Sequence, residues 1–159
     1  MLLYAEVHRA PNDFFRNQER LDVSKFPRII FVCVGNSCRS QMAQGFFNHY
    51  AQQRGLPLTA ESAGTRPAGY VHPTAIQVMR ERGVDISHHT SKGISPAQWL
   101  GYNYVITMGC SDKDACPVNF KGVTRDWGIE DPFDQPVEAY RRARDEIERK
   151  VLALLDEVG

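Results

Sequence analysis

Segments typical of strands alternate with segments typical of helices along this chain, and no other feature restricts its fold as much. Short apolar runs rich in β-branched residues predict strands at 28–33, 58–64 and 102–109, with a weaker one at 122–128. Apolar residues at helical spacing predict helices at 40–54, 72–83 and 137–158. Such alternation indicates one α/β domain, in which helices cover both faces of a parallel sheet.

Composition limits the classes of partner. The 159 residues fit one domain, and 42% apolar with 24% charged residues is typical of a folded chain. Lys plus Arg and Asp plus Glu both number 19, so no overall field favours nucleic acid or an acidic membrane, and we expect neither as a partner. No apolar run reaches the ~20 residues of a membrane span. Glu6 interrupts the apolar start, which argues against a signal peptide and predicts a cytoplasmic location.

The cysteines indicate reactive thiols rather than a metal site. In a reducing cytosol, thiols serve catalysis, redox chemistry or metal binding more often than static disulfides. The spacing shows neither Cys-x-x-Cys nor His-x3-His, so we predict no metal and no tightly bound cofactor. The four residues are Cys33, Cys38, Cys110 and Cys116.

Cys33 ends the first predicted strand, and a short loop leads from it into a helix. Ligands of parallel sheets bind beyond the carboxyl ends of the strands. The free N–H groups of the helix start, its dipole and the Arg39 guanidinium converge there and suit a tetrahedral oxyanion. The same surroundings favour the Cys33 thiolate, whereas the alternative is a small buried hydrophobe. The predicted oxyanion loop comprises Val34, Gly35, Asn36, Ser37, Cys38, Arg39 and Ser40.

Here the sequence resembles a known family. "CVGNSCRS" resembles the active-site loop of the low-molecular-weight tyrosine phosphatase superfamily, and "NSCRSQMA" is similar to its thiol-dependent arsenate reductase branch, since the phosphatases more usually read "NICRSPMA". The similarity continues through "ESAGT", "DISHHTSK", "VITMGCSDKDACP" and "DWGIEDP", and covers 28–158. It implies one three-layer α/β domain at 27–159, with a four-stranded parallel sheet flanked by helices. Residues 1–26 are then an N-terminal extension of unknown role.

The resemblance implies roles for matching residues. Cys33 is the nucleophile, the loop backbone and Arg39 bind the oxyanion, Ser40 donates to the thiolate, and Asn36 braces the loop. Asp131 is the general acid, and the proline after it favours an extended backbone that can hold the carboxyl over the loop. The simpler reading of Asp-Pro is a turn.

Two further thiols distinguish reduction from hydrolysis. Reducing arsenate takes two electrons, which two thiols supply by forming a disulfide. The resemblance implies a relay of redox-active cysteines from Cys33 to Cys110 and then to Cys116, with packing as the alternative role of the last two. Ser111 and Asp114 resemble a capping box, which predicts a helical turn at 112–116 that must unwind before Cys110 and Cys116 can join.

The sequence thus predicts a cytoplasmic arsenate reductase, with phosphate or sulfate as look-alike ligands. Thioredoxin is the expected reductant, and mycothiol or glutathione systems are alternatives. The alternative functions are a low-molecular-weight protein tyrosine phosphatase and a non-catalytic oxyanion- or thiol-sensing module. Some relatives bind a potassium ion near the loop through acidic side chains. This chain has Gln44 and Lys92 there, and the Lys92 ammonium is expected to replace the ion.

Overall fold

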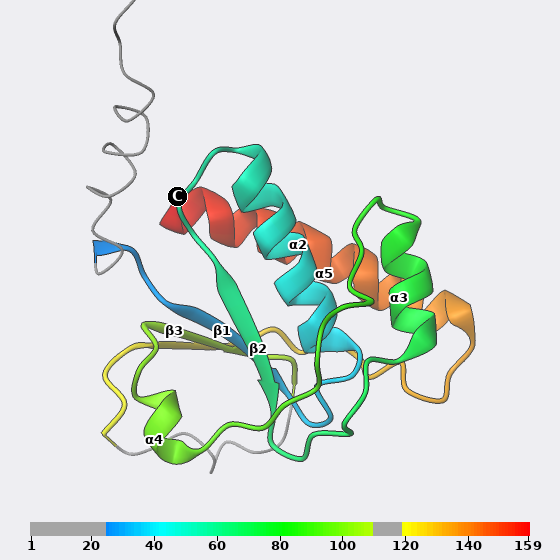
Figure 1. The fold of residues 1–159 in the computed structure, drawn as a ribbon, viewed down its shortest axis with the longest axis horizontal. Coiled ribbons are helices and arrows are strands. Elements are labelled where there is room, and N and C mark those ends of the chain that lie inside the picture. Colours follow the sequence, from blue (N-terminus) through cyan, green and yellow to red (C-terminus); the bar gives the residue numbers. More distant parts are fainter. Residues whose placement is uncertain (1–24, 110–118) are drawn as a thin grey trace, which may run out of the picture.

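Four parallel strands form one sheet in the computed structural model, which describes residues 25–109 and 119–159 (Figure 1). The spatial order is β2-β1-β3-β4, and every adjacent pair is parallel. The predicted four-stranded parallel sheet of a single α/β domain is therefore confirmed. The strands are β1 (Ile29–Cys33), β2 (Ala60–Gly64), β3 (Tyr104–Thr107) and β4 (Val123–Asp126).

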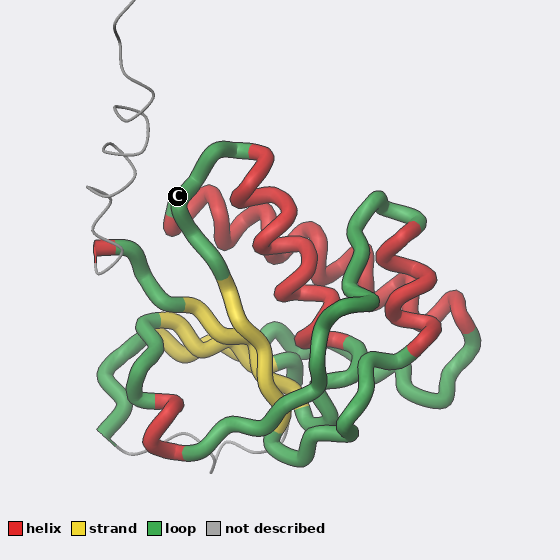
Figure 2. Tube along the Cα trace, in the orientation of Figure 1, coloured by secondary structure: helices red, strands yellow, loops and turns green. Residues whose placement is uncertain are grey.

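Three of the helices follow the predicted periodicity (Figure 2). They are α2 (Arg39–Gln53), α3 (Pro73–Arg80) and α5 (Val137–Val158). The fourth, α4 (Pro96–Trp99), is a single turn that periodicity cannot reveal, because one turn presents no repeating face. Its sequence signal is the capping box between Ser95 and Gln98, which the strand and helix analysis missed.

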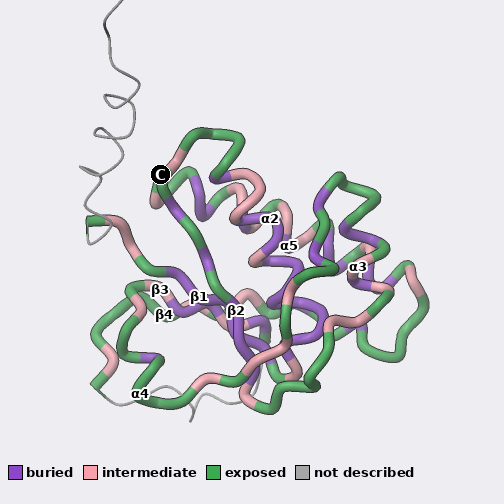
Figure 3. Tube along the Cα trace, viewed as in Figure 1, coloured by how far each residue is buried: buried purple, intermediate pink, exposed green. Residues whose placement is uncertain are grey.

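The two faces of the sheet are covered unequally (Figures 1 and 3). Ile29, Phe31 and Cys33 point to the face covered by α2 and α5, where the main core lies, and α3 packs against these two helices. Ile30 and Val32 alternate to the other face and form a smaller core with Trp99 of α4. Among the described residues, the layer on this second face consists of α4 and loops.

The carboxyl ends of the strands lie at one level. Cys33 is in register with Gly64, and Thr107 pairs with both Val32 and Asp126. The chain leaves β1 on one side toward β2 and returns on the other as β3, so the switch of direction falls beside Cys33. In open α/β sheets this is the place of the ligand crevice.

The ends of the observed strands lie inside the predicted ranges. The predicted strand at 102–109 is shortened to four residues, and the one at 58–64 begins at Ala60, because pairing ends where the neighbouring strand ends. Phe26 packs against the main core, and the division at 26/27 stays a prediction. The predicted helical turn at 112–116 lies outside the described residues.

The helices were also compared with the requirements of a membrane span. Within residues 25–109 and 119–159, none combines sufficient length with sufficiently apolar composition to cross a bilayer.

Candidate active site

A cavity of about 200 Å³ lies beyond the carboxyl end of β1. It is smaller than the ~300–1,000 Å³ of sites for drug-sized ligands, and therefore suits a small anion better. Two cysteines, an arginine and a carboxylate share its wall. The lining residues are Cys33, Val34, Gly35, Ser37, Cys38, Arg39, Ala68, Asp131 and Phe133.

The carbonyl groups of the loop are bound from outside by the segment after β2. The N–H groups of Thr65, Arg66 and Ala68 donate to the carbonyls of Cys33, Val34 and Gly35, at 3.1, 2.8 and 2.8 Å. The N–H of His72 donates to the carbonyl of Ser37 at 2.9 Å. In a trans peptide the N–H points opposite to the C=O, so these bonds turn the N–H groups of the following residues away from this segment.

The start of α2 leaves several of these N–H groups free. In the part of the chain that the structure describes, the N–H groups of Ser37, Cys38 and Arg39 have no acceptor. Free N–H groups at a helix start, together with the positive end of its dipole, form an anion site. The predicted loop therefore has the local geometry that an oxyanion requires.

The Cys33 sulfur receives two hydrogen bonds. The N–H of Asn36 donates to Sγ at 3.2 Å, and Ser40 Oγ lies 2.9 Å from it. Because Asn36 Nδ2 donates to Ser40 Oγ at 2.8 Å, the serine hydroxyl hydrogen is left for the sulfur. Both contacts direct a hydrogen at the sulfur.

Asn36 holds the loop in a left-handed turn. Its φ is 48°, a conformation that asparagine tolerates better than most residues. Its side chain is fully buried and donates also to Ser62 Oγ at 3.0 Å. Gly64 lies so near that a Cβ there would be 2.5 Å from the Val34 carbonyl oxygen and 2.9 Å from the Asn36 nitrogen. A glycine at 64 is therefore required for the loop to lie against β2.

Arg39 joins the loop to two other segments. Its Nη1 donates to the carbonyls of Met108 and Ile129, both at 2.9 Å, and its Nη2 lies 3.5 Å from Asp131 Oδ2. Arg39 is 6% exposed and Asp131 is largely exposed. The guanidinium has five N–H donors, so donors remain for an anion. Met108 and Ile129 precede Cys110 and Asp131 by two residues, which places both segments beside the loop.

Cys38 differs from Cys33 although both line the cavity. Burial raises the pKa of the Cys38 thiol to about 11, opposed by hydrogen bonding to Ser37 and Tyr140. The Ser37 hydroxyl lies 3.7 Å from the Cys38 sulfur. Cys38 is thus kept neutral, in agreement with a packing role.

The positions expected to hold a cation in some relatives are occupied differently here. Gln44 accepts a hydrogen bond from Ser62 at 2.5 Å, and the Lys92 ammonium donates to the Thr90 carbonyl at 3.3 Å. The Lys92 ammonium would repel a potassium ion, and Gln44 Oε1 already accepts from the Ser62 hydroxyl. Across the described residues, no group of three His, Cys, Asp or Glu side chains is arranged to hold a metal. That the protein needs no metal or bound cofactor stays a prediction.

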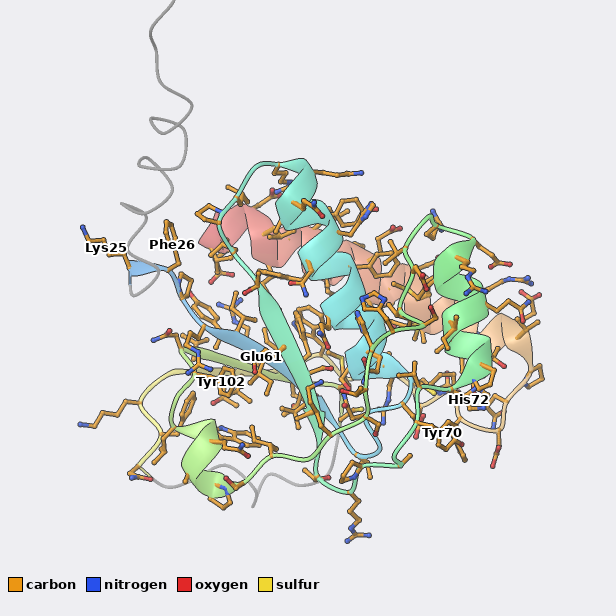
Figure 4. All side chains as sticks on the ribbon, viewed as in Figure 1. Lys25, Phe26, Glu61, Tyr70, His72 and Tyr102 are labelled. Carbon is orange, nitrogen blue, oxygen red and sulfur yellow. The ribbon has the colours of Figure 1, made fainter. Side chains whose placement is uncertain are left out.

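A row of aromatic side chains begins at Phe133, which lines the cavity. His72 contacts the ring of Phe133 at a centroid distance of 5.7 Å and that of Tyr70 at 6.3 Å. Tyr70 and His72 are labelled in Figure 4. A larger cavity, of about 440 Å³, lies at the opposite ends of the strands, beside Glu61 and Tyr102 (Figure 4). Its lining contains neither a cysteine nor a histidine.

The structure thus places Cys33, the loop 34–40 and Asp131 around one cavity, and their roles stay predictions. Cys110 and Cys116 lie outside the described residues. Sequence reasoning assigned no role to Gln41 and His89, which lie behind the loop. The signal available for Gln41 was the glutamine that distinguishes "NSCRSQMA" from "NICRSPMA".

The fold and the site define a class of α/β protein. Its first strand ends at a cysteine, and the loop that follows turns its carbonyl groups away from the cavity and toward the segment after β2. The chain belongs to the Low molecular weight phosphotyrosine protein phosphatase family, whose model matches residues 28–159.

Within that family the chain is similar to arsenate reductases, which confirms the predicted resemblance. "Arsenate reductase 1" of Staphylococcus epidermidis is 45% identical over 125 residues, 77% of this chain and 91% of that protein. A solved structure described as an arsenate reductase in the phosphate binding state has a TM-score of 0.74 and 34% identity, and the match covers 84% of this chain and all of that one. A thioredoxin-dependent arsenate reductase of Corynebacterium glutamicum has a TM-score of 0.69 and 32% identity, with 84% and 62% covered.

Proposed function

We propose that this protein reduces arsenate to arsenite by a thiol relay, with Cys33 as nucleophile and thioredoxin as reductant. The observation that carries the proposal is the Cys33 sulfur, which two donors bind at the bottom of an anion-sized cavity. The similarity to arsenate reductases, one of them thioredoxin-dependent, supports arsenate as the substrate and thioredoxin as the partner.

The first step forms a covalent adduct. The Cys33 thiolate attacks arsenic, one arsenate oxygen departs as water, and a sulfur–arsenic bond replaces the arsenic–oxygen bond. Asp131 supplies the proton to the departing oxygen, which its position beside Arg39 permits. The loop N–H groups and Arg39 bind the remaining oxygens.

The second step transfers the electrons. The Cys110 thiolate attacks the Cys33 sulfur, and the sulfur–arsenic electron pair leaves with arsenic, which is reduced from As(V) to As(III) and departs as arsenite. Cys33 and Cys110 are now joined. Cys116 then attacks the Cys110 sulfur and releases the Cys33 thiolate, so that two electrons from an external dithiol restore the Cys110–Cys116 pair.

Arg39 connects the anion site to the segment that precedes Cys110. Its Nη1 binds the carbonyl of Met108, two residues before Cys110, so one guanidinium contacts the anion site and the segment that leads to the second thiol.

The test is arsenite release with thioredoxin and its reductase present or absent. We expect many turnovers with the complete system, about one arsenite per chain for Cys116→Ser, and none for Cys33→Ser. Multiple turnover by Cys116→Ser with thioredoxin would contradict the relay. Mycothiol or glutathione systems are assayed in parallel as the alternative reductants.

A phosphatase is the second candidate, because Cys33, Arg39 and Asp131 share one cavity and hydrolysis needs no further thiol. It predicts turnover of an aryl phosphate without a reductant, unchanged in Cys110→Ser and Cys116→Ser. An oxyanion- or thiol-sensing module predicts phosphate binding without turnover in either assay.

A further inference from the structure

The loop has five carbonyl groups from Cys33 to Ser37, and that of Asn36 differs from the other four. It accepts a hydrogen bond from a side chain and none from a backbone N–H. The other four accept from the backbone N–H groups of the segment 65–72. The Asn36 carbonyl accepts instead from Gln41 Nε2 at 3.0 Å. Gln41 is fully buried on α2, one turn behind the loop.

The contacts of Gln41 fix the orientation of its amide. Nε2 lies 3.0 Å from each of three oxygens, namely the carbonyl and Oδ1 of Asn36 and the carbonyl of Thr90. A carbonyl oxygen in that place would face three acceptors, so the NH₂ group must be there. Oε1 therefore faces His89 Nδ1, at 3.0 Å, and this ring nitrogen must carry the hydrogen.

The geometry points to Gln41 and His89 as positioning residues for the oxyanion site, an inference that rests on the proposed role of Cys33. Gln41 holds the Asn36–Ser37 peptide with its carbonyl toward α2, and His89 holds the amide of Gln41. Since the peptide is trans, the same contact directs the Ser37 N–H the opposite way, toward the cavity that Ser37 lines. Were this peptide to turn over, a carbonyl oxygen would face the anion in place of an N–H.

The segment that carries His89 fastens the loop at further points. Ser91 Oγ donates to the Gly35 carbonyl at 3.0 Å, and the Lys92 N–H donates to Asn36 Oδ1 at 2.9 Å. Gln41 Nε2 binds the Thr90 carbonyl of the same segment. The amide of Gln41 thus lies between the loop and residues 89–92, and its loss would loosen both.

His89 keeps this role over the working pH range. Burial, followed by the positive charges of His88 and Lys92, lowers its pKa to about 4, against the attraction of Asp85. The ring is therefore neutral near pH 7, with its hydrogen on Nδ1.

The experiment measures phosphate binding and thiol reactivity rather than reduction. Iodoacetamide alkylation of Cys33 is quantified by peptide mass spectrometry from pH 5 to 9, with and without inorganic phosphate. We expect Gln41→Leu to weaken phosphate protection about tenfold, because one N–H to an anion is lost, and to raise the midpoint of the alkylation profile by about one pH unit. His89→Leu should shift both in the same direction by a smaller amount, and His89→Asn should restore them, since its amide N–H can replace Nδ1–H.

Two controls separate positioning from stability. Gln52→Leu changes an exposed glutamine of the same helix and should change neither quantity. Val151→Ala removes fully buried methyl groups from α5 and should lower stability without moving the alkylation midpoint.

A Gln41→Leu protein with wild-type phosphate protection and alkylation midpoint would overturn the inference, whatever its melting temperature. A wild-type Cys33 that reacts like a free thiol and is not protected by phosphate would instead refute the proposed function, and the inference with it.

Discussion

Replacing Gly64 by alanine tests the close approach between β2 and the loop. The added Cβ would lie 2.5 Å from the Val34 oxygen and 2.9 Å from the Asn36 nitrogen, both backbone atoms that no side-chain rotation can move. Reaching the 3.4 Å of ordinary contact requires a shift of about 0.9 Å. We expect a cost of about 1–3 kcal/mol in the free energy of unfolding, as for other overpacked sites. A displacement near 1 Å in catalytic geometry costs roughly 10²-fold in rate, and we expect that loss of arsenate reduction.

Gly93 provides a matched control, because it pairs with Gly64 across an isolated bridge. A Cβ on Gly93 would meet nothing nearer than Pro67 Cγ at 3.5 Å, and its backbone does not require glycine. Gly93→Ala should therefore be neutral or stabilising, by about 0.4–1 kcal/mol. Urea unfolding and the arsenite assay are run on both variants. If Gly64→Ala is as stable and as active as Gly93→Ala, the loop does not depend on this contact.

Three further outcomes are expected. Asp131→Asn should slow formation of the adduct about 10²–10⁴-fold and leave phosphate protection of Cys33 unchanged, and a larger loss in Glu130→Gln would move the acid by one residue. The pKa of His89 is about 4 in the folded chain, below its ordinary 6.5, so the unfolded chain binds more protons between these two pH values. The free energy of unfolding should therefore fall as the pH drops from 6.5 to 4. Urea unfolding at pH 7 and pH 5 should show a smaller fall in this free energy for His89→Asn than for the wild-type protein. Because the pKa of Cys38 is about 11, only about one thiol in a thousand is ionised at pH 8. Iodoacetamide should then label Cys33 faster than Cys38, and equal rates would contradict the raised pKa of the Cys38 thiol.

The features that sequence predicted are those that depend on neighbouring residues. The strand that ends at Cys33 and the helix that follows are visible as an apolar run and a helical repeat, and both are confirmed. That helix begins at Arg39 rather than at the predicted Ser40, a difference that periodicity cannot resolve. The proximity of Asp131 to the loop came from the resemblance, because the 91 residues of chain between Arg39 and Asp131 contain no local signal for it.

The residues that sequence did not explain act across long separations. Gln41 meets His89 48 residues later, and its partner oxygens on Asn36 become acceptors only when the loop adopts its left-handed turn. A single sequence shows a glutamine on a helix and a histidine in a loop, with no indication that they face each other. The positions of Gln41 and His89 are explained by their mutual contact, which exists only in the folded chain.

The loop turns its carbonyl groups outward, and this arrangement determines which substitutions the segment after β2 can accept. Thr65, Arg66 and Ala68 donate through backbone N–H groups, so the identity of their side chains does not enter these bonds. Proline is the exception, because it has no N–H. The chain already has a proline at 67, the position in this stretch from which no loop carbonyl takes a hydrogen bond. In a library covering every substitution, position 66 should therefore tolerate diverse side chains and reject proline, so that an essential support of the site would pass unnoticed in any comparison of side chains alone.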